Sequence, residues 1–256
     1  MDKELKMITL IRQEFYKLFK QRSTQLFLIV LFAFQLFFAV ISMKYPKFYS
    51  PKDAFTSNYF ASAPILFFMI AICSMLITKE RQFGTLRSLL YRKFSYVQVI
   101  LSKIITLVLF IVSTVICSSV ISVIFKFIFA NKVDLTEKIW KDFLFTNLND
   151  FLTLLFLISL VILLGTLVNS SNLALTIGII GYFVLNVFNQ LLFAAIAKFE
   201  WLKWNPLNMM NLGVQIQSSS YHQLTHLTMT QISIGYIVYV LIFLCLAVYS
   251  FRKKSV

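Results

Sequence analysis

Six long runs of apolar residues divide the chain, and polar or charged residues gather in the stretches between them. A bilayer core about 30 Å thick needs about 20 apolar residues for one helical crossing. The runs that approach or exceed this length cover residues 25–43, 59–77, 104–130, 151–168, 173–197 and 231–250. None of them alternates apolar and polar residues in the manner of a β-barrel strand. The pattern predicts an all-α integral membrane protein with six transmembrane helices.

A shorter periodicity marks the N-terminal segment, residues 1–24. Apolar residues recur every three or four positions and share one helical face, while Lys and Arg residues fall on the other side. The apolar face includes Ile8, Ile11, Phe15, Leu18 and Phe19. Such a helix is suited to lie in the membrane interface, with its basic residues toward anionic headgroups. We expect an amphipathic interfacial helix here, although a simple anchor before the first span explains the same pattern.

The charged loop 79–103 lies between the second and third spans. Phe83 and Gly84 end the preceding helix, and Thr85 is suited to cap a short helix after it. The apolar face of that short helix consists of Leu86, Leu89 and Leu90. Three leucines on one side of a surface helix favour a partner surface. The alternative is a solvated loop whose arginines serve only to orient the protein.

Local signals also predict where several helices begin or end. Ser95 and Gln98 form a Ser-x-x-Gln capping box that opens the third span. The four polar residues 169–172 leave room only for a tight hairpin between the fourth and fifth spans. Asn205 followed by Pro206 reads as the cap and first turn of another helix.

The segment 198–230 precedes the sixth span. Trp201 and Trp204 suit the aromatic belt of a membrane interface. We expect the helix that starts at Pro206 to run to about Gln217, and its many apolar residues predict that it dips back into the membrane. The segment is therefore predicted to contain re-entrant outer helices.

Composition and charge agree with a membrane protein. Hydrophobic residues make up 59% of the chain and charged residues only 13%, whereas soluble domains carry about a quarter charged residues. The formal net charge of +14 invites a nucleic-acid partner. However, most Lys and Arg residues fall in the termini and the loop 79–103, which indicates the positive-inside rule and not nucleic-acid binding. We expect a multi-pass protein of the plasma membrane, without a cleaved signal peptide and with both termini in the cytosol.

Motifs for catalysis, cofactors or metals are missing from the sequence. No glycine lies in a Gly-x-x-x-x-Gly-Lys-Ser/Thr context, so the chain has no P-loop for ATP. His222 and His226 resemble half of a zinc-protease motif, but Gln223 occupies the position of the required glutamate. The predicted spans contain no Asp, Glu or His, the residues that ion-coupled transporters bury. We expect no catalytic residue, no bound cofactor and no metal site.

Polar residues inside the spans are candidates for a substrate path. One stripe lies on the third span and a second group on the fifth, at Thr114, Ser118, Ser122, Asn186, Asn189 and Gln190. Small hydroxyl residues in membrane helices also allow close helix packing, which is the bland explanation for the stripe. The amides of the second group, together with Gln35 on the first span, are costlier to bury and are suited to meet substrate or one another.

The loop also carries the residues of a family resemblance. Glu80, the run Gly84-Thr85-Leu86-Arg87 and Lys103 resemble the signature of permease subunits of type-2 ABC exporters. In that family this loop carries a coupling helix that docks on a separate ATPase subunit. By resemblance, the docking residues are Glu80, Arg81, Gln82, Phe83, Gly84, Thr85, Leu86, Arg87, Leu89 and Leu90. Many members have a proline and an arginine just before the third span, where this chain reads Arg92-Lys93-Phe94-Ser95-Tyr96.

The resemblance covers nearly the whole chain and implies one permease domain over residues 1–256. ATP and Mg would bind the partner ATPase, and a second permease copy or a related permease would complete the membrane unit. The outer re-entrant segment, with Trp201, Trp204 and Pro206, would close the exit as an outer gate. We expect a bacterial exporter of a hydrophobic or amphipathic substrate, a peptide first, with a drug, an ion or a lipid-linked glycan as alternatives. A stand-alone secondary transporter or a membrane scaffold without ATP coupling is the other interpretation.

Overall fold

The computed structural model describes residues 2–82, 94–131 and 133–254 of the chain. The regular elements in this part are helices, most of them long. They are α1 (Asp2–Lys20), α2 (Arg22–Lys44), α3 (Pro51–Thr56), η1 (Asn58–Phe60), α4 (Ser62–Gln82), α6 (Tyr96–Phe129), α7 (Glu137–Leu167), α8 (Ser171–Ile196), η2 (Glu200–Trp204), α9 (Pro206–Met209), α10 (Leu212–Gln217), η3 (Ser219–Tyr221), α11 (His222–Thr225) and α12 (Met229–Lys254).

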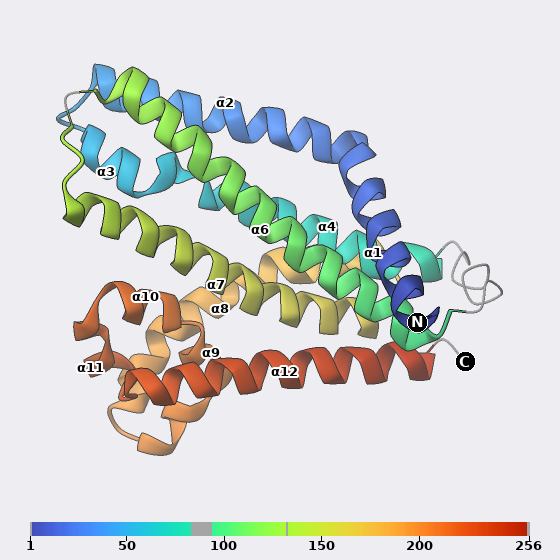
Figure 1. The fold of residues 1–256 in the computed structure, drawn as a ribbon. Helices are drawn as coiled ribbons and strands as arrows, with labels where there is room; N and C mark the ends of the chain where they lie inside the picture. The colour runs from blue at the N-terminus through green and yellow to red at the C-terminus, as the bar shows by residue number, and fades with distance from the viewer. Residues whose placement is uncertain (1, 83–93, 132, 255–256) are drawn as a thin grey trace.

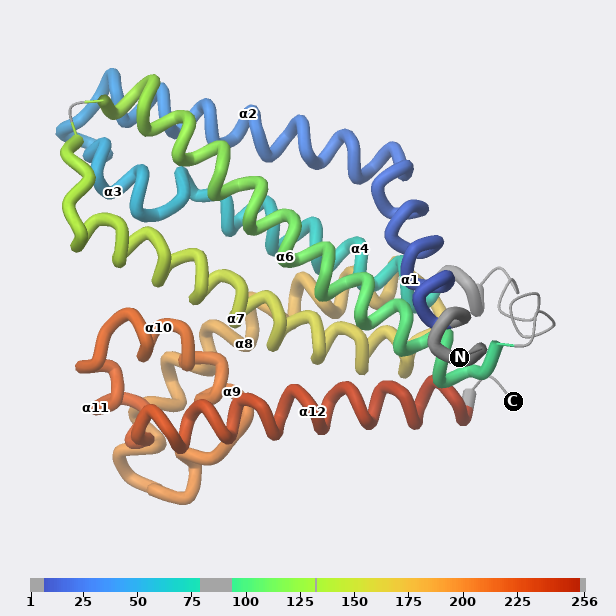
Figure 2. The backbone as a smooth tube through the Cα atoms, in the orientation of Figure 1, coloured from blue at the N-terminus to red at the C-terminus, as the bar shows by residue number. Residues whose placement is uncertain are grey.

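The long helices lie side by side and give the molecule two distinct ends (Figure 1). Both chain termini lie at one end, where α1 bends away from α2; we call this the terminal end (Figure 2). The short helices α3, α9, α10 and α11 gather at the other end, which we call the opposite end. The two ends therefore differ in construction: one holds both chain termini, and the other holds the short helices.

Length and apolar composition make this an all-α, multi-pass membrane protein. Among the described residues, five helices, α2, α6, α7, α8 and α12, are long and apolar enough to cross a bilayer, and a shorter apolar helix covers Ser62–Thr78. Large apolar side chains also point away from the protein along these helices, for example Ile180, Phe183 and Val187 on α8. Such a surface would aggregate in water but is the normal exterior of a protein in lipid.

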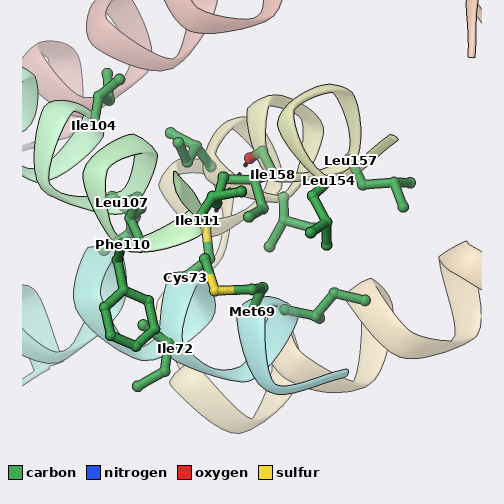
Figure 3. Close-up of a cluster of buried hydrophobic side chains, with 14 of the residues drawn as sticks. Met69, Ile72, Cys73, Ile104, Leu107, Phe110, Ile111, Leu154, Leu157 and Ile158 are labelled. Carbon is green, nitrogen blue, oxygen red and sulfur yellow. Dashed lines mark hydrogen bonds between the residues drawn. The ribbon is translucent and has the colours of Figure 1, made fainter. Parts of the chain in front are cut away.

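The main hydrophobic core joins α2, α4, α6 and α7. Met69 and Cys73 of α4 meet Phe110 and Ile111 of α6 and Ile158 of α7, and all five side chains are buried (Figure 3). Outside this group, the rings of Phe27 and Phe68 stack at 3.8 Å between centroids. In lipid, helices gain little from hydrophobic burial, so close contacts of this kind hold the bundle together.

Local signals in the sequence located three helix ends correctly. The Ser95 amide donates to Gln98 Oε1 at 2.9 Å, and the Gln98 amide donates to Ser95 Oγ at 3.2 Å, which confirms the capping box at the start of α6. The turn between α7 and α8 confirms the tight hairpin, because α7 ends at Leu167 and α8 begins at Ser171. These signals involve neighbours in the chain, and tertiary structure leaves them unchanged.

The start of the second apolar run differs from the prediction. Asn58, Tyr59 and Phe60 have φ values of 55°, 48° and 58°, the left-handed region that side chains other than glycine rarely adopt. The helix α4 therefore begins at Ser62, after this turn. The short helix α3 precedes the turn and packs inward, with the ring of Phe55 stacked on Phe143 at 4.6 Å between centroids. The sequence analysis predicted neither feature.

The segment before α12 is more broken than predicted. The Asn205 side chain accepts hydrogen bonds from the amides of Leu207 and Asn208 at 2.8 and 3.1 Å, so the predicted cap at Pro206 is confirmed. The expected single helix to about Gln217 is wrong, because α9 ends at Met209 and α10 starts anew at Leu212. The interruption places Asn211 where its side chain bonds to α8, a tertiary contact described below.

Candidate functional site

A buried ion pair joins α1 to the start of α6 at the terminal end. Lys103 Nζ lies 3.0 Å from Glu14 Oε2, and Lys17 Nζ lies 2.7 Å from Glu14 Oε1. Only 2% of Lys103 and 5% of Glu14 is exposed, whereas the Lys17 side chain is 59% exposed. We call these three residues the ion cluster. Its two buried members are 89 positions apart in the sequence, so they fasten two separate helices together.

The helical spacing of α1 explains how Glu14 comes to face the protein. Leu10, Glu14 and Leu18 follow one another at four-residue intervals and are all buried. Of the apolar face predicted for this helix, Leu18 is buried, Ile11 and Phe15 are half-buried, and Ile8 and Phe19 are exposed. The side of α1 that packs on the protein is therefore rotated relative to the apolar stripe, and it includes a carboxylate. The sequence analysis missed Glu14.

Electrostatics keep Glu14 ionised in this position. Burial raises its pKa, but the nearby positive charges of Lys103 and Lys17 and their hydrogen bonds outweigh burial, so the pKa lies below its ordinary value of 4.5. A cavity of about 140 Å³ adjoins the cluster and is lined by Glu14, Lys17, Leu18, Gln21, Ile72, Met75, Leu76 and Lys103. The cluster thus lies where α1, α4 and α6 meet.

The residues expected to dock an ATPase lie in the segment that precedes α6, the helix of Lys103. Phe83, Gly84, Thr85, Leu86, Arg87, Leu89 and Leu90 fall outside the described residues. Glu80, Arg81 and Gln82 belong to the last turn of α4, at the terminal end. The loop thus connects the ends of α4 and α6, and Lys103 lies two helical turns into α6. Nothing in the described residues tests the docking role itself.

A second polar cluster, without charges, lies in the half of the bundle nearer the opposite end. Gln35 Nε2 donates to Ser122 Oγ at 2.9 Å and to the Ser118 carbonyl at 3.1 Å. Asn58 Nδ2 donates to Ser118 Oγ and to Asn147 Oδ1, both at 3.1 Å. All five residues are buried, and we call them the amide cluster. It fastens α2, the left-handed turn, α6 and α7 together.

The structure divides the predicted path residues into two groups. Ser118 and Ser122 belong to the amide cluster, and the Thr114 hydroxyl donates to the Phe110 carbonyl at 3.0 Å. These three side chains are buried inside the protein in the structure described. The remaining three lie on α8, where Asn186 and Gln190 are exposed and Asn189 is half-buried. The two groups do not come together in one site.

Neutral side chains also fasten the predicted outer segment. Asn189 and Asn211 exchange hydrogen bonds of 2.8 and 3.0 Å between their amides, which ties α8 to the break between α9 and α10. Asn208 Nδ2 donates to the carbonyls of Lys203 at 2.8 Å and Thr225 at 2.9 Å. Gln215 Nε2 donates to the Leu227 carbonyl at 2.9 Å. The segment is therefore an ordered part of the opposite end.

One glycine lets this segment approach the bundle closely. A Cβ atom added to Gly213 would lie 2.8 Å from the Asn149 Cα atom of α7, a backbone atom that cannot swing aside. The residues predicted for the outer gate lie nearby: Pro206 opens α9, Trp204 is 44% exposed and Trp201 is 74% exposed. The Tyr239 hydroxyl donates to the Trp204 carbonyl at 2.8 Å, which links this part to α12.

The described residues contain no group of three or more His, Cys, Asp or Glu side chains suited to hold a metal ion. His226 has a φ of 54° and ends α11, so His222 and His226 do not share a continuous helical face as the ligands of a zinc protease do. His222 Nδ1 lies 3.2 Å from the Ser219 carbonyl. The histidine pair is part of the exposed surface near the opposite end.

One comparison with known proteins finds a family match over the larger part of the chain. A family model described as "ABC-2 family transporter protein" matches residues 10–189. The matched region begins in α1 and extends into α8, so it includes both the ion cluster and the amide cluster. The segment before α12, and α12 itself, lie beyond the matched residues. A comparison with curated proteins finds no match.

Proposed function

Because the chain belongs to the ABC-2 family of transporter membrane proteins, we propose that it is the membrane-spanning subunit of an ATP-driven exporter. The family match over residues 10–189 is the observation that carries this proposal. The membrane component of such a transporter has no ATPase motif of its own and works with an ABC ATPase.

The proposed topology has six spans with the terminal end in the cytosol of a bacterial cell. The five long apolar helices and Ser62–Thr78 would supply the spans. The distribution of charge supports the orientation, since cytosolic segments are enriched in Lys and Arg. The helix α1 and the ends of α2, α6 and α12 that lie at the terminal end carry the basic residues Arg12, Lys17, Lys20, Arg22, Lys103, Arg252 and Lys253. Both termini would then be cytosolic.

The proposed docking element for the ATPase is the segment from Glu80 to Leu90. Its position supports this role, because α4 leads into it and α6 leads out of it at the terminal end. An ATPase subunit that docks there, and that itself binds ATP and Mg, would act directly on two helices of the main core. In the membrane, the exposed side of α1, with Ile8 and Phe19, would face lipid.

The proposed substrate is hydrophobic or amphipathic, most simply a peptide. Support comes from α8, which exposes the amides of Asn186 and Gln190 beside large apolar side chains. Amides exposed to hydrocarbon are costly, so a second permease copy or a substrate path would cover them. The segment with Trp201, Trp204 and Pro206 would act as the outer gate, since it lies at the opposite end beside α8.

The test is purification of the chain from its native membrane in a mild detergent. Copurifying proteins are identified, and ATP hydrolysis is measured for the wild type and for Glu80→Lys and Gly84→Pro. We expect a stoichiometric ABC ATPase with the wild type, and a loss of coupling between hydrolysis and transport in both variants. Gly181→Ala is the matched control, because a Cβ atom at that position meets nothing within 4 Å.

Two results would contradict the proposal. A purified chain that is free of any ATPase would favour a stand-alone transporter or a scaffold. Unchanged ATP hydrolysis and transport in both loop variants would remove the docking role from the segment Glu80 to Leu90, even if an ATPase copurifies.

A further inference from the structure

We infer that Glu14 is a positioning residue that makes α1 and the start of α6 move as one body when the ATPase acts on the adjacent loop. This inference rests on the proposed function and adds a specific route to it. Glu14 would act through Lys103, because their charged atoms lie 3.0 Å apart.

The Glu14–Lys103 pair lies near the start of α6. Residue 94 directly follows the segment 83–93, and α6 begins at Tyr96. Lys103 lies two turns into α6, in the half of the helix nearest the segment 83–93, so a displacement of that segment would reach Lys103 before it reaches the far half of the helix. Glu14 belongs to α1, which α2, α3, η1 and α4 separate from the loop in the sequence.

Burying the charges of Glu14 and Lys103 has a cost in hydration free energy. A buried ion pair loses hydration and adds little net stability compared with apolar side chains of similar volume. Leu10 and Leu18 flank Glu14 on the buried side of α1 and would dock the helix without a charge. What the ion pair adds is a single register, because Glu14 Oε2 and Lys103 Nζ lie 3.0 Å apart and a slip of α1 past α6 by one helical turn would separate them. A contact that transmits motion from α6 to α1 needs such a fixed register.

The helix α1 is attached to the rest of the bundle through α2. Gln21 marks the bend between α1 and α2, and α2 carries Gln35 into the amide cluster. A motion of α1 that follows α6 would therefore reach α2 from its terminal end, while the amide cluster ties α2 to α6 and α7 further along. In this arrangement the loop moves two neighbouring helices together, and the ion pair prevents α1 from slipping past α6.

The test measures whether the two helices keep their distance during the ATP cycle. Spin labels are attached through Gln13→Cys on α1 and Val97→Cys on α6, both exposed positions, after the native cysteines are replaced by alanine. Distances are recorded in the complex with the ATPase subunit, without nucleotide and after trapping with ATP and vanadate. The variants are Glu14→Gln, Glu14→Asp and the exchange Glu14→Lys with Lys103→Glu. Glu137→Gln is the control, because its ion pair with Lys141 is exposed on α7.

We expect one narrow distance in the wild type, identical in both states, and the same result for Glu137→Gln. In Glu14→Gln the distance should shift between states by more than the width of the wild-type distribution, and the exchange variant should restore the single distance. Glu14→Asp, which keeps the charge, should shift less than Glu14→Gln. A pair that only stabilises the fold would give the same distance in both states for Glu14→Gln.

The inference is overturned if the wild-type distance itself differs between the two states, which needs no variant to fold. It is also overturned if Glu14→Gln behaves as the wild type, or if the exchange restores nothing. Failure of the proposed function has a different signature: no ATPase subunit copurifies with the wild type, or no vanadate-trapped state forms. In that case the inference falls with the function it rests on.

Discussion

The ion cluster and the amide cluster perform the same task with different chemistry. Each fastens helices that are distant in the sequence, but Glu14 and Lys103 do so with opposite charges, whereas Gln35 and Asn58 use neutral amides. The ion cluster lies near the end of the bundle and beside a cavity, and the amide cluster lies deeper between α2, α6 and α7. The cost of desolvating a charge rises with depth in a bilayer, so the difference agrees with the proposed topology, in which the terminal end lies at the cytosolic interface.

The comparison also separates two mechanical roles. The amide cluster holds a strained turn in place, since Asn58, Tyr59 and Phe60 all have positive φ values. The ion cluster holds two whole helices, α1 and α6, in register. Disrupting the first should unfold a local turn within the core, and disrupting the second should release one helix at the edge.

The largest effect is expected for Asn58→Leu. The change removes hydrogen bonds to Ser118 and Asn147 and puts a bulky side chain at a φ of 55°. Lost buried hydrogen bonds and left-handed strain together predict a loss of about 4 kcal/mol in the free energy of unfolding. Denaturant unfolding in detergent measures it. Asn58→Gly keeps the backbone freedom, so it should lose about half as much; equal losses for the two variants would assign the whole effect to the side chain.

Glu14→Gln should have the next largest effect, confined to the terminal end. It leaves Lys103, which is 2% exposed, without its carboxylate partner at position 14. Breaking a buried pair on one side predicts a loss of about 3 kcal/mol in the docking of α1. Hydrogen exchange should show faster exchange in α1 and unchanged protection around Gln35. Glu137→Gln removes an exposed pair and should change stability by less than about 0.5 kcal/mol; a loss as large as that of Glu14→Gln would refute the assigned role of burial.

Gly213→Ala tests whether the opposite end is a separate cooperative unit. The added Cβ would approach the Asn149 Cα atom to 2.8 Å, so α10 must move off α7 at a cost of about 2 kcal/mol. Exchange should accelerate in residues 198–230, while α1 and the ion cluster keep their protection. Gly181→Ala, with open space around it, is the control. Faster exchange throughout the bundle would show instead that the two ends unfold together.

The smallest effect is a pH dependence of the docking of α1, which the neutral side chains of the amide cluster do not share. The pKa of Glu14 is lowered in the folded protein, so between the folded and unfolded values the undocked state binds more protons. The docking free energy of α1 therefore increases with pH across that interval, is fully present above pH 4.5 and is lost as the pH falls through the lower folded value. Hydrogen exchange of α1 at several pH values, corrected for intrinsic rates, measures it. The dependence should vanish in Glu14→Gln, and its persistence there would assign it to another group.

Sequence reasoning succeeded where neighbours in the chain decide the structure. The capping boxes and caps at Ser95 and Asn205 depend on contacts two or three residues away, and both were located correctly. The apolar runs likewise predicted the membrane helices, because each helix of that length satisfies its own backbone in lipid. The family resemblance pointed to the same class of protein that the match over residues 10–189 establishes.

The remaining features depend on partners far away in the sequence. Glu14 meets Lys103 across 89 positions, and Asn58 meets Ser122 across 64, so no local pattern marks either residue. The break at Asn211 follows from its bond to Asn189 on α8. A lone acid at four-residue spacing between Leu10 and Leu18 was the one available signal for the ion cluster. Glu14 was not singled out from this spacing, because the wider apolar stripe dominated the pattern.

The central claim is that the terminal end receives an ATPase and the opposite end does not. A photo-reactive amino acid placed at Leu86, and separately at Trp201, which is 74% exposed, tests this in native membranes. Illumination followed by identification of the cross-linked protein compares the two ends of the same molecule under the same conditions. The account predicts an ABC ATPase cross-linked from position 86 and none from position 201. An ATPase captured from position 201, or from neither position, would contradict it.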